Sequence, residues 1–253
     1  MPPPTRPVPG GGSVAATRTG RRGIPGALAA LGGALLDLLL PPRCAACGDP
    51  PDPGTPFCRT CGEAVDRPDP GCPRCGRAGP ESLCGPCHLA PPSFDALRAA
   101  AGFGGPMADA VHALKYAGRA AVAESLGRWM ASRVEIPAAA AVVSVPLGRR
   151  RRIERGYDQA SLLADALARG AGSPRLRAAL RRVRETPPQV GRDRVTRAAN
   201  VRGAFAASPA VAGRDVVLVD DVVTTGATAD ACARALREAG ARSVTVVALA
   251  RAE

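Results

Sequence analysis

The pattern of apolar and polar positions divides the chain into parts of different character. Residues 1–22 show no apolar period, whereas leucines within 26–40 recur every three or four positions and form one helical stripe that ends at Pro41 and Pro42. Residues 43–92 are rich in Pro, Gly and Cys and hold few other apolar side chains. From residue 93 onward, helical and strand patterns alternate, which predicts an α/β fold with a mainly parallel sheet flanked by helices.

The periodicities also predict individual elements. We expect helices over 106–116, 120–133, 157–169 and 227–239, and strands over 141–146, 201–206, 214–220 and 243–250. The resulting organisation is a disordered tail over 1–25, an amphipathic helix over 26–42, a small cysteine-rich region over 43–92 and an α/β domain over 93–253.

Composition narrows the classes of function. Apolar residues make up 46% of the 253 positions, which is enough for a core and excludes a wholly disordered chain. The formal net charge of +12 favours phosphorylated or polyanionic ligands. Lys115 is the one lysine among 34 basic residues, so the arginine richness reflects GC-rich coding and is not itself a nucleic-acid signal. An aromatic content of 3% argues against a surface that stacks bases on rings.

The longest apolar run does not predict a membrane span. It covers the 17 residues from Ile24 to Leu40 and contains Pro25 and Asp37, whereas a span needs about 20 mostly apolar residues. Arg21 and Arg22 before this run imitate a twin-arginine signal, but no clean cleavage site follows. We therefore expect a cytoplasmic protein, in which nine cysteines favour metal binding over disulfides.

Eight cysteines form four C-x-x-C pairs, and glycine follows three of them. Two such pairs supply the four thiolates of one tetrahedral zinc site, so four pairs predict two structural Zn²⁺ ions without an open position for catalysis. Sequential pairing is our choice, crossed pairing is the alternative, and a redox dithiol is disfavoured because the motif repeats. Cys232, the ninth cysteine, is expected to be a core residue. The predicted ligands are Cys44, Cys47, Cys58 and Cys61 for the first site and Cys72, Cys75, Cys84 and Cys87 for the second.

A buried strand, a hydroxyl-rich turn and a helix follow one another over residues 216–228. Ligands of open α/β sheets bind at the carboxyl ends of strands, and the N–H groups of a helix N-terminus favour phosphate. Asp220 and Asp221 would repel phosphate, so we expect them to accept hydrogen bonds from sugar hydroxyls. A phosphate beside a vicinal diol indicates a ribose 5-phosphate ligand. The predicted phosphate-binding residues are Thr224, Thr225, Gly226, Ala227 and Thr228.

Basic residues elsewhere are candidates for the opposite end of such a ligand. Arg149 to Arg152 and Arg155 follow an apolar strand, where a loop could meet pyrophosphate oxygens; a solvated surface is the alternative. Lys115 offers a compact ammonium group. The polar stretch 185–200 could form a lid over the site or an ordinary surface loop.

Through these motifs the chain resembles the ComF family of competence-associated, phosphoribosyltransferase-like proteins. Residues 216–228 look like the phosphoribosyl-pyrophosphate signature of type I phosphoribosyltransferases. Residues 38–44, 114–119, 143–147 and 155–159 look like further family motifs, and the family's usual aromatic–Asn–Gln reads Tyr157-Asp158-Gln159 here. The resemblance runs from about Leu35 to Leu249. It implies a type I phosphoribosyltransferase-like sheet preceded by a double zinc ribbon.

The resemblance also implies a ligand and two competing functions. The first is binding of phosphoribosyl pyrophosphate with Mg²⁺, followed by transfer or hydrolysis of the phosphoribosyl group. Catalytic roles would then fall to Asp220, Asp221 and Arg155, with Lys115, Pro146 and Arg155 on the pyrophosphate side. The second is a non-catalytic accessory protein that binds single-stranded DNA and works with the helicase machinery of DNA uptake.

Overall fold

The computed structural model describes residues 41–116, 120–184, 201 and 203–252. The predicted tail, the predicted lid over 185–200 and all but the last two residues of the predicted amphipathic helix over 26–42 lie outside these residues. Along the described chain the elements are α2 (Arg59–Glu63), α3 (Gly85–Leu89), β1 (Ala96–Gly102), α4 (Gly105–Tyr116), α5 (Val122–Arg133), β2 (Ala141–Ser144), α6 (Arg149–Arg155), α7 (Gln159–Ala171), β3 (Leu180–Arg182), β4 (Phe205–Ala207), the 3-10 turn η1 (Pro209–Val211), β5 (Asp215–Val223), α9 (Ala227–Glu238) and β6 (Ser243–Arg251).

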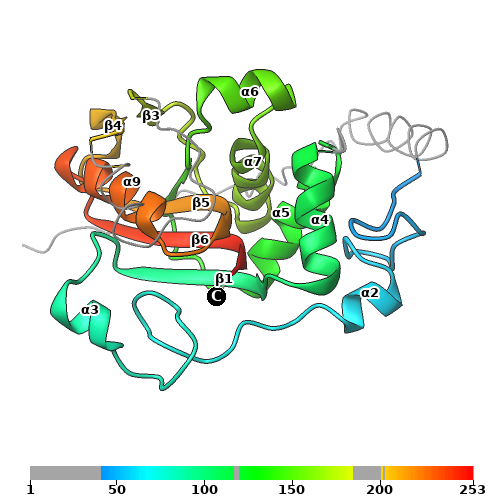
Figure 1. Ribbon diagram of the computed structural model, residues 1–253. Helices are drawn as coiled ribbons and strands as arrows, with labels where there is room; N and C mark the ends of the chain where they lie inside the picture. The colour runs from blue at the N-terminus through cyan, green and yellow to red at the C-terminus, as the bar shows by residue number, and fades with distance from the viewer. Residues whose placement is uncertain (1–40, 117–119, 185–200, 202, 253) are drawn as a thin grey trace, which may run out of the picture. The chain divides into compact units, whose positions relative to one another are not determined.

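The central sheet has the strand order β1-β6-β5-β2, and every neighbouring pair is parallel (Figure 1). This confirms the predicted parallel α/β sheet. The segment predicted as a strand over 201–206 is instead the short β4, which pairs antiparallel with β3 in a separate two-stranded sheet. The strand predicted over 214–220 is longer than expected, because β5 continues to Val223 and carries both predicted carboxylates within it.

Two layers of side chains cover the two faces of the sheet. Val217 and Val219 of β5 join one core cluster with buried residues of α4, α5 and α7, whereas Val216 and Leu218 join the opposite cluster with α9. This alternation follows from the two-residue period of a strand. The continuous apolar run of β5 is thus explained by burial on both faces.

Helices α5 and α7 pack closely because one position on α5 has no side chain. A Cβ atom on Gly127 would lie 2.5 Å from the Cβ of Ala166 and 2.7 Å from the carbonyl oxygen of Leu163. Both distances are well below van der Waals contact, so only glycine fits this crossing. The close approach fixes α7, whose first turn borders the cavity described below.

Candidate functional site

The strand–turn–helix predicted for the phosphate loop is formed by β5, residues 224–226 and α9. Gly226 precedes the helix with φ +79°, a left-handed conformation that glycine adopts without steric cost. The N–H of Ala227 donates to Oγ1 of Thr225 over 3.4 Å. The first N–H groups of α9 have no intrahelical acceptor, so this end of the helix favours an anion.

Asp220 and Asp221 lie side by side near the end of β5. Oδ1 of Asp220 accepts the N–H of Asp221 over 2.9 Å, and Oδ1 of Asp221 accepts the N–H of Val222 over 2.6 Å. Burial, reinforced by the negative charge of Asp221, raises the pKa of Asp220 to about 8. Asp220 therefore keeps its proton well above the pH at which a free carboxyl ionises, because ionisation would place a buried charge beside that of Asp221, which repels it.

Lys115 of α4 relieves part of this repulsion. Its Nζ lies 3.2 Å from Oδ2 of Asp221, and the two side chains are only 20% and 15% exposed. The structure thus brings Lys115 to the carboxylates, a pairing that the sequence analysis did not anticipate when it placed this lysine on the pyrophosphate side. The ammonium group lowers the pKa of Asp220 against the larger effect of burial.

Arg155 is held by Gln159 and Tyr116, two motif residues that were not among the predicted site residues. Its Nη1 donates to Oε1 of Gln159 over 2.9 Å, and its guanidinium carbon lies 5.2 Å from the ring centroid of Tyr116. Gln159 is 1% exposed and occupies the buried face of α7 together with Leu163. A polar residue at a buried helical position was the available sequence signal. The basic run that contains Arg155 is the helix α6, not the predicted loop.

Asp158 joins the first turn of α7 to the loop after β2. Its Oδ1 accepts the N–H of Ser161 over 3.0 Å, which caps the helix, while Oδ2 accepts the N–H of Leu147 over 3.2 Å. Oδ2 also pairs with Nη2 of Arg152 over 3.2 Å. An asparagine has one acceptor oxygen on its side chain, so the aspartate found here makes contacts that the amide usual in the family could not all reproduce.

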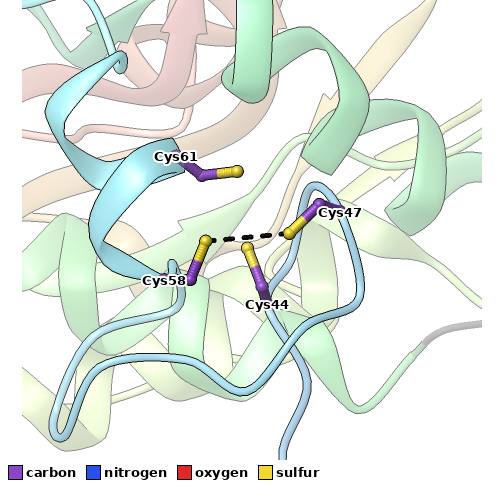
Figure 2. Close-up of side chains that lie close together, drawn as sticks. All are labelled: Cys44, Cys47, Cys58 and Cys61. Carbon is purple, nitrogen blue, oxygen red and sulfur yellow. Dashed lines mark hydrogen bonds between the residues drawn. The ribbon is translucent and has the colours of Figure 1, made fainter.

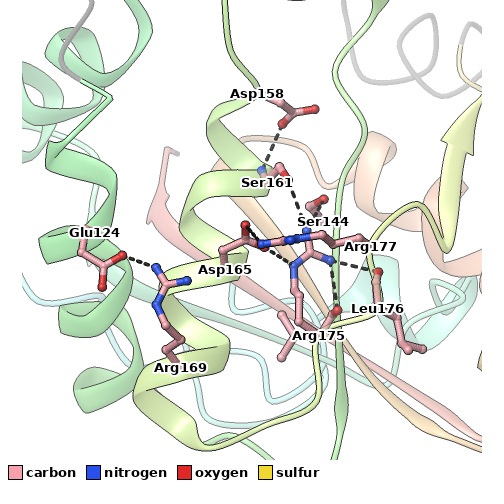
Figure 3. A network of polar contacts seen from close by, with 10 residues as sticks. Glu124, Ser144, Asp158, Ser161, Asp165, Arg169, Arg175, Leu176 and Arg177 are labelled. Atoms are coloured by element: carbon pink, nitrogen blue, oxygen red, sulfur yellow. Dashed lines mark hydrogen bonds and ion pairs between the residues drawn. The ribbon is translucent and has the colours of Figure 1, made fainter. Parts of the chain in front are cut away.

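A largely shielded arginine, Arg175, contacts the elements on both sides of the same loop (Figure 3). Arg175 is 12% exposed, and its Nε donates to Oδ1 of Asp165 over 2.8 Å. Its Nη2 donates to the hydroxyl oxygens of Ser144 over 3.1 Å and Ser161 over 3.3 Å. Arg175 therefore connects the end of β2 with the start of α7, the two elements that border the cavity.

Asp220 and Asp221 of β5 line one cavity of about 980 Å³ together with Arg155, Asp158 and Gln159, whereas Arg175 is not among its lining residues. Its walls are the carboxyl-terminal part of β5 with its two aspartates, the loop after β2 and the basic helix α6. Of the predicted phosphate-binding residues, Thr228 lines the cavity. Residues 224–227 directly precede it in the sequence but are not among the lining residues. The cavity is lined by six of the predicted site residues, namely Lys115, Pro146, Arg155, Asp220, Asp221 and Thr228.

The cysteines form two clusters in chain order, as the sequential pairing predicts. Within each cluster the four sulfur atoms lie within 4.8 Å of one another. Figure 2 shows the first cluster, in which Sγ of Cys47 and Sγ of Cys58 are 3.7 Å apart. In the second, Sγ of Cys75 and Sγ of Cys84 are 3.6 Å apart. A tetrahedral zinc with bonds of about 2.3 Å separates its sulfurs by close to these distances, whereas a disulfide needs about 2.05 Å.

In each cluster the backbone stabilises the thiolate of one cysteine, whereas burial and the neighbouring thiols raise the pKa of Cys61 in the first cluster and of Cys87 in the second. Burial opposes ionisation of Cys44, but backbone N–H groups of Cys58, Cys47 and Ala46 outweigh it and lower the pKa of its thiol to about 6. Cys72 of the second cluster shows the same behaviour, with its pKa also about 6. Both clusters fit structural Zn²⁺ with four protein ligands each.

The clusters also contribute to the core. Cys44 is fully buried, and the ring of Phe57 contacts the ring of Trp129 on α5 edge-on, with centroids 5.6 Å apart. Cys72 and Cys87 are buried in the second cluster. Cys232 is buried in α9, as predicted for a core residue.

Comparison with known proteins assigns both regions. Residues 35–88 match the double zinc ribbon domain, and residues 158–253 match the phosphoribosyl transferase domain. The chain therefore combines a phosphoribosyltransferase-like α/β fold with an amino-terminal double zinc ribbon. Among the described residues, no helix has the length and apolar character needed to cross a bilayer.

Curated relatives define the family. The chain is 36% identical to DNA utilization protein YhgH of Salmonella typhi, over 69% of this chain and 80% of that protein. It is 32% identical to competence protein F of Haemophilus influenzae, over 67% and 78%. Competence protein ComFC of Bacillus subtilis is 33% identical over 44% of each chain. The chain belongs to the ComF family of competence-associated, phosphoribosyltransferase-like proteins.

Among solved structures, the chain matches the glutamine phosphoribosylpyrophosphate amidotransferase from B. subtilis complexed with ADP and GMP. It matches 66% of this chain with 24% sequence identity and a TM-score of 0.38. The chain spans about a third of that protein's length.

Proposed function

We propose that the cavity binds phosphoribosyl pyrophosphate, or a related ribose 5-phosphate ligand, and that the protein acts on its phosphoribosyl group. The observation that carries the proposal is the juxtaposition of two carboxylates with a helix N-terminus in one cavity. The 5-phosphate would lie against the residue 224–228 loop, where N–H groups and hydroxyls donate. Asp220 and Asp221 would accept hydrogen bonds from the ribose hydroxyls.

The opposite wall of the cavity suits the pyrophosphate group. Arg155 projects from α6 with its guanidinium oriented by Gln159 and Tyr116, so little conformational freedom is lost on binding. Lys115 and Pro146 also line the cavity, and we assign them to the pyrophosphate as well; Lys115, which pairs with Asp221, would then lie between the two ends of the ligand. When the C1–oxygen bond breaks, the leaving pyrophosphate gains charge, and Arg155 would stabilise it.

Mg²⁺ would accompany the ligand. Carboxylate and phosphate oxygens are the ligands that this hard cation prefers, and the cavity offers the carboxylates of Asp220 and Asp221. Bound there, Mg²⁺ would neutralise phosphate charge. The ion pair of Asp221 with Lys115 would compete with direct metal contact, which favours binding of Mg²⁺ together with the phosphates.

Calorimetric titration with phosphoribosyl pyrophosphate and Mg²⁺ tests the proposal. Asp221→Asn keeps the shape of the side chain and removes its charge, and each charge-assisted hydrogen bond contributes about 1.5–3 kcal/mol. We expect affinity to fall roughly ten- to a hundredfold. Asp215→Asn, at the other end of β5, is the matched control and should bind normally.

Sugar analogues distinguish diol recognition from general anion binding. Ribose 5-phosphate should compete for the cavity, whereas 2-deoxyribose 5-phosphate should compete poorly because it lacks one diol oxygen. Thr225→Val should weaken both sugars about equally, since they share the phosphate. Equal competition by both sugars, with wild-type affinity in Asp221→Asn, would contradict the phosphoribosyl proposal.

A second candidate is single-stranded DNA binding by a non-catalytic accessory protein, together with helicase machinery of DNA uptake. The names of the relatives, DNA utilization protein and competence protein, favour it. So does the basic side of the cavity itself, where α6 carries four consecutive arginines, of which Arg150 and Arg151 line the cavity, and where Tyr116 is 65% exposed. Both candidate functions are consistent with the cytoplasmic location that we propose.

Salt separates the two candidates. Binding of an oligonucleotide through the α6 arginines should weaken steeply as salt rises and depend little on sequence. Replacing Arg150 and Arg151 with glutamine should reduce the slope, while zinc content stays the same. Affinity that does not change with salt would exclude phosphate contacts as the basis of DNA binding.

A further inference from the structure

One residue within the second cysteine cluster reaches well beyond it. Arg74 lies between Cys72 and Cys75, so its backbone belongs to the turn that presents two of the sulfur ligands. Its Nε donates to the carbonyl oxygen of Phe94 over 3.2 Å, and its Nη2 donates to that of Pro92 over 3.1 Å. The turn thereby holds the segment Pro92–Asp95, which we call the connecting segment.

The connecting segment lies directly against the phosphate loop. The N–H of Ser93 donates to Oδ1 of Asp230 in the first turn of α9 over 2.6 Å. Phe94 is 2% exposed, and its ring approaches to 4.0 Å of where a Cβ atom on Gly226 would stand. Gly226 is the left-handed residue from which α9 begins. The segment thus contacts both the turn of the loop and the helix that follows it.

The second cluster is itself anchored to the sheet. The carbonyl oxygen of Pro73 accepts a hydrogen bond from Nη1 of Arg98 on β1 over 2.8 Å, and that of Cys75 accepts one from Nη1 of Arg251 on β6 over 2.7 Å. A turn fixed on two strands and closed by four sulfur ligands is a rigid support. Arg74 transmits that rigidity to the connecting segment.

The first cluster has different neighbours. Its buried residues Cys44 and Phe57 join the core on the α4 and α5 face of the sheet, whereas Phe94 joins the α9 face. The two clusters therefore support opposite layers, and the second one supports the layer that contains the phosphate loop.

We propose that Arg74 is a positioning residue through which the metal-bound second cluster holds the phosphate loop in its anion-binding conformation. That the loop binds an anion rests on the proposed function. That Arg74 and the second cluster hold the conformation of the loop does not. Loss of the two Arg74 hydrogen bonds should let the loop sample other conformations. The population able to bind, and hence the apparent affinity, falls in proportion.

Arg74→Met tests the inference because methionine keeps much of the apolar stem and removes both donors. We expect two zinc ions per chain to be retained. Amide hydrogen exchange over residues 225–230 should become about five- to tenfold faster, and phosphoribosyl pyrophosphate should bind more weakly by a similar factor. Arg59→Met is the matched control, since Arg59 is exposed and lies within a cysteine pair of the first cluster.

Unchanged exchange over residues 225–230 in an Arg74→Met protein that holds two zinc ions would overturn the inference. If that variant loses zinc, Phe94→Leu decides, because this residue lies outside the cluster: faster exchange in the loop supports the inference, and wild-type exchange refutes it. Hydrogen exchange needs no ligand. Failure of the wild-type protein to bind phosphoribosyl pyrophosphate would therefore count against the proposed function alone.

Discussion

Replacing Asp220 with asparagine should stabilise the protein, and increasingly so as the pH rises. The pKa of this carboxyl rises from 3.8 to about 8 in the folded chain because of burial and the charge of Asp221. The folded state therefore holds the proton more tightly than the unfolded state does. Stability is lost as the pH climbs from about 4 to about 8 and stays level above that range.

The size of the effect follows from the pKa difference. Each unit corresponds to about 1.4 kcal/mol, so the full shift costs the fold up to about 6 kcal/mol at pH 9, an upper value because the two carboxyls titrate together. Between pH 6 and pH 9 the advantage of Asp220→Asn should grow by about 2–3 kcal/mol, or roughly 5–10 °C in Tm. Asparagine retains the oxygen that accepts the N–H of Asp221.

Thermal unfolding of both proteins at pH 6, 7, 8 and 9 measures this difference. Comparing variant with wild type at each pH cancels the effect of pH on the zinc sites. Asp215→Asn is the control, because Arg242 and Ser243 hold the pKa of Asp215 well below its usual range. That variant should lose stability by a constant amount across the same range. An Asp220→Asn advantage that is equal at pH 6 and pH 9 would refute the reasoning.

Three further predictions concern the zinc clusters, Arg175 and the phosphate loop. Metal analysis of reduced protein should find about two zinc ions per chain, and Cys44→Ser should lose one and become protease-sensitive; fewer than one in the wild type would contradict the Cys₄ assignment. Arg175→Met should lower the free energy of unfolding in urea by about 3 kcal/mol, because it removes the more shielded of the two arginines that pair with Asp165; a loss below about 1 kcal/mol would show that Arg177 suffices. Gly226→Ala should lower the free energy of unfolding by about 1–2 kcal/mol, because alanine is strained at this positive φ even though there is space for its methyl group. Calorimetry should also show weaker binding of phosphoribosyl pyrophosphate. Unchanged stability would mean that the turn relaxes without strain.

The features that the sequence predicts well are those encoded over short distances. The apolar run of β5, the threonine-rich turn and Gly226 follow one another directly, so their order specifies strand, loop and helix. The cysteine pairs likewise carry their spacing in the sequence. In both cases the residues that make the structure are neighbours in the chain.

The features that the sequence does not predict depend on partners far away in the chain. β1 is rich in alanine, which has weak strand propensity, and it becomes a strand because β6 offers a parallel edge. The contact of Lys115 with Asp221 joins α4 to β5 across the fold. The arginine run forms the helix α6 because arginine has good intrinsic helix propensity. The prediction of a pyrophosphate-contacting loop at this position did not take that propensity into account.

The position of β6 sets an order for synthesis and folding. β6 follows every other described strand in sequence, yet it lies inside the sheet, between β1 and β5. β1 therefore cannot pair with its neighbour until most of the chain has been synthesised. The N–H of Val244 donates to Asp95, which lies 149 residues earlier in the chain. The eight cysteines all lie within residues 44–87 and can gather metal long before that. On the ribosome, we expect the zinc clusters to form first and the sheet to close last, around a ribbon that is already rigid.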